Sequence, residues 1–259
     1  MRYLVIVLLL FLESCSSGTG EQSWILAEEL FHQGKYKESI RQFQKVVEAD
    51  PKSEIGQRAF IRMAEIQNIY LSDYENSIKS YRHFILRSTD RDLILFSQEQ
   101  IATIQFKKIG DYKGAIKSYE ILLNYRPKLK NQDEILHQIG ECYFRLLNFE
   151  KSLFFFKKQL EEYPDSAYAE ETLFEISNVY FTKGDYSKAI EAYLEVIRRF
   201  PRGKFAVSAR FGIASSYEEQ DQLEKAYLLL KEIEDVYPNK EAIRTKMKHL
   251  LNRKISSKR

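Results

Sequence analysis

Large apolar residues and small residues recur along the chain with a helical spacing, in six segments of the same pattern. Each segment begins with one large residue: Tyr36, Tyr74, Tyr112, Phe149, Tyr186 and Leu223. Three residues later stands a small one: Ser39, Ser77, Ala115, Ser152, Ala189 and Ala226. Seven residues later stands a second large one: Phe43, Tyr81, Tyr119, Phe156, Tyr193 and Leu230. Spacings of three and four place these positions on one helix face, so each segment predicts an amphipathic helix.

The prolines follow these helices with a regular period. Four of the five are 37 residues apart: Pro127, Pro164, Pro201 and Pro238. The fifth, Pro51, precedes them by 76 residues, which is two periods of 38. A second amphipathic segment stands before each motif, and three repeats have a glycine between the two segments: Gly34, Gly110 and Gly184. Because proline cannot continue a helix, the pattern predicts repeated helical hairpins, each closed by a turn.

Composition supports a folded, mostly helical chain. Only 10 glycines and 5 prolines occur in 259 residues, and 44% of the residues are hydrophobic. A net charge of +3 does not demand a polyanionic partner, and we expect no nucleic-acid binding. Residues 240–259 hold eight basic residues and one acidic residue. We expect a basic capping helix and tail over residues 239–259, which is either solvated or docked on an acidic partner or an anionic envelope surface.

The first residues resemble a bacterial lipoprotein precursor. After Met1 and Arg2, residues 3–12 are apolar and too few to span a bilayer, which needs about 20. The following sequence, Leu-Glu-Ser-Cys, ends at Cys15 and resembles a lipobox, with a glutamate where a small or apolar residue is usual. The resemblance implies a signal peptide over residues 1–14, a lipid on the Cys15 thiol and a tether over residues 15–23. A secretory signal cut after Ser16 is the alternative.

The repeat resembles the tetratricopeptide repeat (TPR) family over residues 24–238. Glycine, aromatic, small residue, aromatic and proline recur there in one order and one phase. The resemblance implies an all-α fold, a right-handed superhelix of about six helical hairpins followed by the capping helix. A period of 37 or 38, behind a lipidated cysteine, resembles envelope lipoproteins of the outer-membrane assembly (BamD) group and the TPR part of the CpoB group.

The family's register also implies which residues line a peptide-binding groove. The expected groove residues are Lys108, His137, Glu141, Arg145, Phe174, Asn178, Phe181, Phe211 and Glu218. Aromatic and charged side chains of both signs suit an extended or helical peptide. For each residue taken singly, a solvated or packing role is the alternative.

Signatures of enzymes, metals and cofactors are missing from the sequence. The four histidines are isolated, and there is no glycine-rich phosphate loop. Cys142 lies among apolar residues, where we expect a buried, inert thiol. We therefore expect no enzyme, no cofactor and no metal.

Three functions follow from these observations. The first is a non-enzymatic scaffold at the bacterial outer membrane, lipid-anchored at Cys15 and facing the periplasm, which binds other envelope proteins or peptides, with outer-membrane β-barrel assembly as its specific version. The second is a TPR lipoprotein of cell division, peptidoglycan synthesis or pilus and secretin assembly. The third, an envelope hydrolase, would need a catalytic constellation that the sequence does not show.

Overall fold

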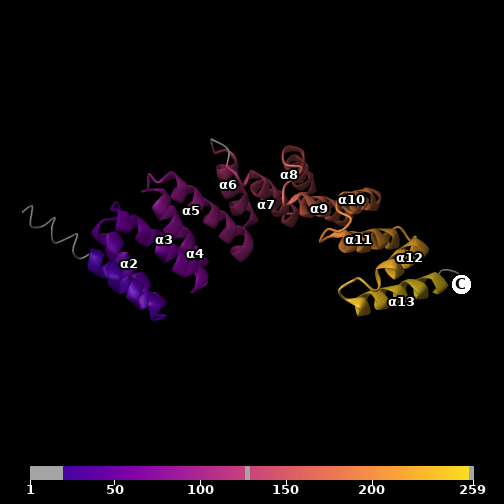
Figure 1. The fold of residues 1–259 in the computed structure, drawn as a ribbon, viewed down its shortest axis with the longest axis horizontal. Coiled ribbons are helices and arrows are strands. Elements are labelled where there is room, and N and C mark those ends of the chain that lie inside the picture. Colours follow the sequence, from indigo (N-terminus) through magenta and orange to yellow (C-terminus); the bar gives the residue numbers. More distant parts are fainter. Residues whose placement is uncertain (1–19, 126–128, 257–259) are drawn as a thin grey trace, which may run out of the picture. The chain divides into compact units, whose positions relative to one another are not determined.

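Helices are the only regular elements in the residues that the computed structural model describes, 20–125 and 129–256 (Figure 1). The prediction of an all-α fold built from helical hairpins is confirmed. The signal peptide, Cys15 and the first part of the expected tether lie outside the described residues. Residues 20–23, which the sequence pattern assigns to the tether, are already helical. The chain divides into two units, Met1–Asn124 and Tyr125–Arg259.

The first unit consists of hairpins packed in chain order. The helix over residues 20–32 is followed by α2 (Tyr36–Ala49), α3 (Glu54–Ile69), α4 (Tyr74–Ile85), α5 (Arg91–Ile104), a short π-helix η1 (Gln105–Ile109) and α6 (Tyr112–Leu123). Each of the helices α3, α4 and α5 contacts the helix before it and the helix after it. This nearest-neighbour packing is the arrangement expected of a repeat architecture.

The second unit continues the same pattern. It contains α7 (Gln132–Arg145), α8 (Phe149–Glu162), α9 (Ala169–Thr182), α10 (Tyr186–Arg199), α11 (Ala206–Glu219), α12 (Leu223–Ile233) and α13 (Lys240–Ser256). The last of these is the expected basic capping helix, and it packs against α12 (Figure 1).

The repeated motif forms the buried face of the second helix in each hairpin. All six small residues of the motif are fully buried, and none of the second large residues is more than 3% exposed. Two of the small residues also bond across their hairpins, because Ser39 Oγ donates to the Ala27 carbonyl at 2.7 Å and Ser77 Oγ to the Ala64 carbonyl at 2.8 Å. The prediction that these positions share one face is confirmed.

Each hairpin turn contains one residue with a left-handed backbone, two positions before the second helix. Glycine takes this conformation in three turns, at Gly34, Gly110 and Gly184, with φ of 74°, 73° and 82°. The other three turns use residues with a Cβ: Ser72, Leu147 and Asp221. Since a Cβ disfavours positive φ, the glycines fit the turn that ends the first helix of each hairpin.

The next residue caps the second helix in most hairpins. The caps are Asp73, Asp111, Asn148 and Asp185, whose side chains accept a hydrogen bond from the backbone N–H three residues later. An N-cap of this kind contributes about 1 kcal/mol. In these four hairpins, a left-handed residue followed by a capping side chain therefore fixes where the second helix begins.

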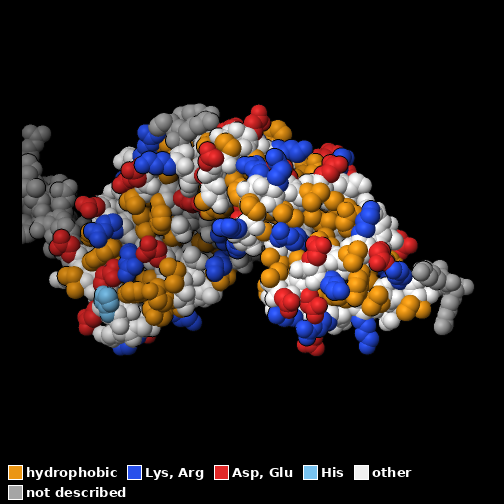
Figure 2. Space-filling view, turned by 45° about the vertical axis from the view of Figure 1, so that its right-hand side comes forward, with side chains coloured by type: hydrophobic (Ala, Val, Ile, Leu, Met, Phe, Trp, Pro, Cys, Tyr) orange, Lys and Arg blue, Asp and Glu red, His pale blue; other side chains and the backbone are white. Residues whose placement is uncertain are grey.

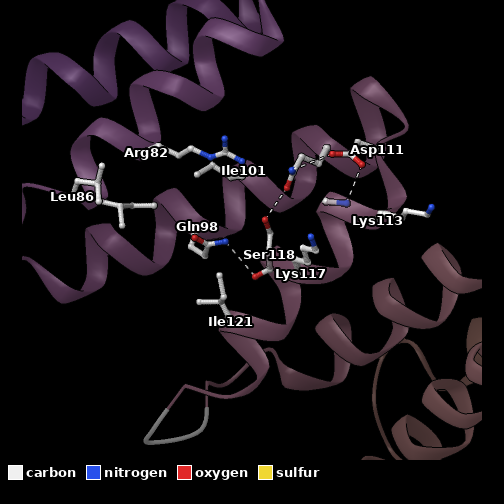
Figure 3. Close-up of a pocket in the computed structure, with 12 residues that line it drawn as sticks. Arg82, Leu86, Gln98, Ile101, Asp111, Lys113, Lys117, Ser118 and Ile121 are labelled. Atoms are coloured by element: carbon white, nitrogen blue, oxygen red, sulfur yellow. Dashed lines mark hydrogen bonds between the residues drawn. The ribbon is translucent and has the colours of Figure 1, made fainter.

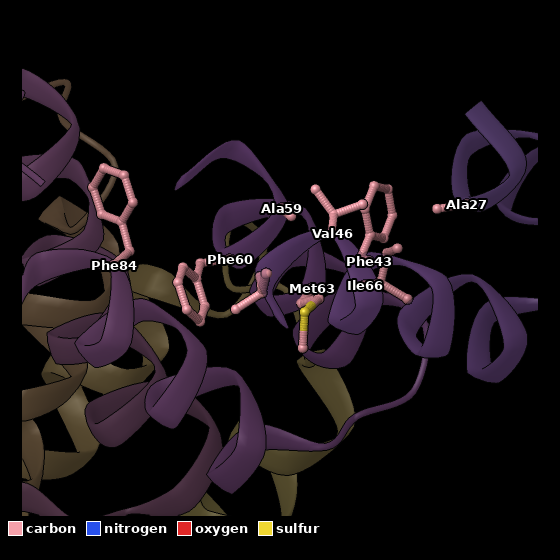
Figure 4. Packing of buried hydrophobic residues seen from close by; sticks show 9 residues of the cluster. Ala27, Phe43, Val46, Ala59, Phe60, Met63, Ile66 and Phe84 are labelled. Carbon is pink, nitrogen blue, oxygen red and sulfur yellow. The ribbon is translucent and has the colours of Figure 1, made fainter. Parts of the chain in front are cut away.

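The core of the first unit is shared between hairpins. Phe43 of α2, Phe60 of α3 and Phe84 of α4 belong to one buried cluster (Figure 4). Trp24 packs edge-on against Phe43, with ring centroids 5.1 Å apart. Burying a phenylalanine contributes about 1.5–3 kcal/mol. Because successive hairpins supply these rings, no hairpin buries its apolar face alone.

Candidate functional site

The first helices of the hairpins in the second unit lie against one another. Helix α9 contacts α7 and α11 as well as its own hairpin partner α10. Polar residues of α7 and α9 come together here, and we call this set the first-helix face: Glu141, Arg145, Glu171, Glu175 and Asn178. These side chains are half-buried, except Arg145, which is exposed.

Hydrogen bonds order the first-helix face. On α7, Arg145 Nη2 lies 3.3 Å from Glu141 Oε1. On α9, Asn178 Nδ2 donates to Glu175 Oε2 at 3.3 Å. The Tyr193 hydroxyl of α10 donates to Asn178 Oδ1 at 2.6 Å, which fixes the orientation of the Asn178 amide. The second helix of the hairpin thus positions a carboxylate on the first.

Glu175 is the carboxylate that its surroundings perturb. Burial raises its pKa above 4.5, and the neighbouring charges of Glu141 and Glu171 raise the pKa further. The hydrogen bond from Asn178 and the charge of Arg145 oppose these effects, and the net shift is upward. A desolvated carboxylate among like charges favours a cationic partner group, which would relieve both effects.

The sequence pattern identified only part of this set. It selected Glu141, Arg145 and Asn178, which the structure brings together with Glu171 and Glu175. Residues 171, 175 and 178 are spaced by four and three, which is a helical face in the sequence itself. That spacing could have identified Glu171 and Glu175, and they change the sign of the face. Three carboxylates stand there against one guanidinium.

In the second unit, one ring on each of the first helices α7, α9 and α11 packs on a second ring. The second ring comes from the segment just before α9, α11 and α13, respectively. The pairs are His137 with Tyr168 at 5.2 Å, Phe174 with Phe205 at 4.8 Å and Phe211 with Tyr237 at 5.1 Å between ring centroids. Such pairs contribute about 0.5–1.5 kcal/mol beyond their buried area. These three expected groove residues therefore couple successive repeats.

His137 and Glu218 are engaged in contacts within the chain. His137 is 2% exposed, and its Nδ1 lies 2.8 Å from Thr172 Oγ1. Glu218 is 9% exposed and pairs with two cations of the capping helix, Lys246 and Arg253. The expectation that these two side chains face a groove is corrected, because one belongs to the core and the other holds α13.

Phe181 and Lys108 are the remaining expected groove residues. Phe181, near the end of α9, is half-buried and meets the Tyr186 ring edge-on at 5.5 Å. Lys108 is exposed on η1, in the first unit. Neither residue contributes to the polar cluster around Glu175.

The basic charge of α13 is largely used within the chain. Arg253 bridges Glu218 at 3.3 Å and Asp221 at 3.1 Å, and Arg244 Nε lies 2.6 Å from Glu234 Oε1. Lys246 and Lys254 pair with Glu218 and Glu224. These pairs fasten the helix to α11 and α12, so an acidic partner would have to compete with carboxylates of the chain itself.

The remaining candidate chemistry is structural. Burial raises the pKa of the Cys142 thiol to about 12, which fits the expected inert cysteine. No group of three metal-ligating side chains occurs in residues 20–125 and 129–256. Within the same residues, every helix is too short or too polar to cross a bilayer.

Comparisons with known families identify the repeat. Family models described as tetratricopeptide repeat match residues 24–53, 134–166 and 174–240. A comparison with curated proteins finds no match.

Solved structures with the same fold are numerous and distant in sequence. The C-terminal part of a TPR repeat-containing protein from Cytophaga hutchinsonii is 19% identical, with 82% of this chain and 78% of that one covered and a TM-score of 0.60. PilW, a type IV pilus biogenesis factor, is 14% identical, with 88% and 98% covered and a TM-score of 0.57. YrrB, a TPR protein with an unusual peptide-binding site, is 17% identical, with 80% and 97% covered and a TM-score of 0.55. The chain is therefore built of tetratricopeptide repeats, in both of its units.

Proposed function

We propose that the chain is a non-enzymatic scaffold of the bacterial envelope that binds a protein segment on the first-helix face. The observation that supports this proposal is the cluster of Glu141, Glu171 and Glu175 near Arg145, on helices that pack in series. Its partner is a peptide segment with lysine or arginine among apolar residues, because cationic side chains would neutralise the acidic excess.

The anchor belongs to this proposal. A lipid on Cys15 would hold the scaffold at the outer membrane, facing the periplasm. Each buried CH₂ of an acyl chain contributes about 0.8 kcal/mol, so two or three chains make a permanent anchor. Changing Cys15 to alanine is expected to move the protein from the membrane fraction to the soluble periplasmic fraction. A Cys15→Ala variant that stays with the membrane contradicts the anchor.

The specific role that we propose is in outer-membrane β-barrel assembly, which rests on the resemblance of the repeat period and the cysteine to the BamD group. A second candidate is pilus or secretin assembly. The match to PilW over 88% of the chain supports that candidate at the level of the fold.

Purification of the full-length, solubilised protein from envelopes distinguishes these roles. A barrel-assembly component that co-purifies supports the first role, and a pilus or secretin component supports the second. Figure 2 shows charges of both signs scattered over the visible face. A charge change at the first-helix face must therefore be compared with the same charge change at another exposed position. Glu141→Lys is expected to lose the partner, whereas Glu161→Lys, on the exposed side of α8, is expected to keep it. If both variants recover the partner equally, the partner does not bind at the first-helix face.

A further inference from the structure

A concave surface lies within the first unit, where the second helices α4 and α6 both contact the first helix α5. It has a volume of about 570 Å³, and side chains of α4, α5 and α6 line it (Figure 3). We call it the α4–α6 pocket and define it by Arg82, Leu86, Gln98, Lys113, Lys117 and Ile121. It shares no residue with the first-helix face, so neither site depends on the other.

The side of the pocket formed by α6 includes two small residues. Gly114 and Ser118 are among the α6 residues that line it. A Cβ at Gly114 would clash with the Asp111 carboxylate and the Gln105 amide. The Ser118 hydroxyl donates at 2.7 Å to Oε1 of Gln105, which also lines the pocket. Neither Gly114 nor Ser118 has a long side chain that could fill the space beside α6.

Aliphatic side chains flank the opening. Leu86 at the end of α4 is 78% exposed, and Ile121 near the end of α6 is 58% exposed. The half-buried Ile85 and the buried Ile101 continue the apolar lining inward. Exposed aliphatic groups around a cavity are a place where an inserted apolar side chain would remove surface from water.

The charge around the pocket is mainly positive. The exposed cations Arg82, Lys113 and Lys117 have no carboxylate partner among the residues that the structure describes. Asp111, the acidic residue of the lining, is engaged locally. Its Oδ1 accepts from the Gly114 N–H at 2.9 Å and its Oδ2 from Gln105 Nε2 at 3.4 Å. A ligand with carboxylates would therefore meet three available cationic groups.

The interior also offers a group that favours a peptide over a lipid. Gln98 donates through Nε2 to the Ser118 carbonyl at 3.3 Å, which leaves its Oε1 as an acceptor. A peptide N–H can donate to this oxygen, whereas an acyl chain would cover it without a hydrogen bond.

We infer that the α4–α6 pocket is a docking site for an acidic protein segment that inserts one large apolar side chain. The apolar side chain would contact Leu86 and Ile121, and flanking carboxylates would pair with Arg82, Lys113 and Lys117. The site would let one scaffold bind an acidic segment in addition to the cationic segment proposed for the first-helix face.

Fluorescence anisotropy on the full chain tests this inference. The probe is a labelled synthetic peptide with a Leu-Phe centre flanked by aspartate and glutamate, and its counterpart has lysine in place of every acid. We expect the acidic peptide to bind and the basic one not to bind. Lys117→Glu should weaken binding about tenfold, since it replaces a charge-assisted contact by a repulsion. Lys45→Glu makes the same charge change on the exposed side of α2 and should leave binding within about twofold.

Leu86→Ser separates insertion from charge attraction alone. It should weaken binding about fivefold, and because Leu86 is exposed, circular dichroism should show an unchanged fold. The inference is overturned if the acidic peptide does not bind at millimolar concentration, if Lys117→Glu and Lys45→Glu behave alike, or if the basic peptide binds equally well. Binding of phosphatidylglycerol vesicles without the peptide would also overturn it, in favour of a lipid site.

Discussion

Leu147 holds a backbone φ of 57° at the position where three of the hairpins have glycine. Left-handed backbone costs a residue with a Cβ about 1–2 kcal/mol. Because Leu147 is 68% exposed, burial of its side chain contributes little stability to offset this cost. Leu147→Gly should therefore raise the free energy of unfolding by about 1 kcal/mol, as measured by urea denaturation.

The same substitution elsewhere provides the control. Leu194 is similarly exposed, at 52%, but lies inside α10. Glycine in a helix interior costs about 1 kcal/mol, so Leu194→Gly should destabilise the protein. A destabilised Leu147→Gly would show that Leu147 makes contacts in the turn that outweigh its strain.

The buried carboxylate of Glu175 makes stability depend on pH. Because its folded-state pKa is raised, the folded protein holds this proton more tightly than the unfolded chain does. The resulting loss of stability is absent below the ordinary pKa and grows as pH rises through the raised pKa. Glu175→Gln should therefore be more stable than wild type at pH 7, with a difference that disappears near pH 4 in thermal unfolding.

Glu161→Gln is the control, because it removes an exposed charge from α8 instead of a buried one. Its stability should not differ from that of wild type in this pH-dependent way. If Glu175→Gln is less stable than wild type at pH 7, the carboxylate is held by contacts stronger than its desolvation.

The sequence pattern predicts the contacts of single side chains least well. His137 and Glu218 occupy helix positions that resemble ligand-binding ones, but their partners come from elements more than 25 residues away: Thr172, Lys246 and Arg253. No local spacing encodes such contacts. The spacing of Glu171, Glu175 and Asn178 marks a helical face, but it does not show the raised pKa of Glu175, because that shift depends on burial and on charges from α7 as well as on Glu171.

At the scale of elements, the sequence was most informative about the second helices. Each of them begins at the first large residue of the motif: Tyr36, Tyr74, Tyr112, Phe149, Tyr186 and Leu223. This agreement has a physical cause, since a left-handed turn residue and a capping side chain come directly before most of these positions. The first helices lack such a uniform signal. The π-helix η1 that ends one of them was not predictable from apolar spacing.

The capping helix α13 makes a prediction at this scale. Ion pairs to Glu218 hold it on α11, so Glu218→Ala should loosen α13 at a cost of about 1–3 kcal/mol from lost charge-assisted bonds. Hydrogen exchange should show faster exchange of the amides of residues 243–254, with the helices of the first unit unchanged.

Glu232→Ala removes the same charge from the exposed side of α12 and should leave the exchange of α13 as in the wild type. Equal protection of α13 in both variants would mean that apolar contacts, such as those of Ile243 and Leu250, hold the helix without the ion pairs.

At the scale of the whole molecule, each unit of repeats carries its own candidate surface. The second unit has the acidic first-helix face, and the first unit has the basic α4–α6 pocket. Opposite charges on the two surfaces favour different partners, which is what a scaffold requires. The sequence predicted the repeat stack, but neither the sign of each surface nor the pocket, because both depend on which side chains of neighbouring helices meet.

Site-specific photo-crosslinking in cells tests the central claim, that the first-helix face binds another protein. A photo-reactive amino acid replaces Arg145, which is exposed on α7, and in a matched strain it replaces Leu194, which is exposed on α10. We predict a discrete crosslinked envelope protein from position 145 that is lost when Glu141→Lys is added, and none from position 194. The same products from both positions, or none from position 145, would contradict the account.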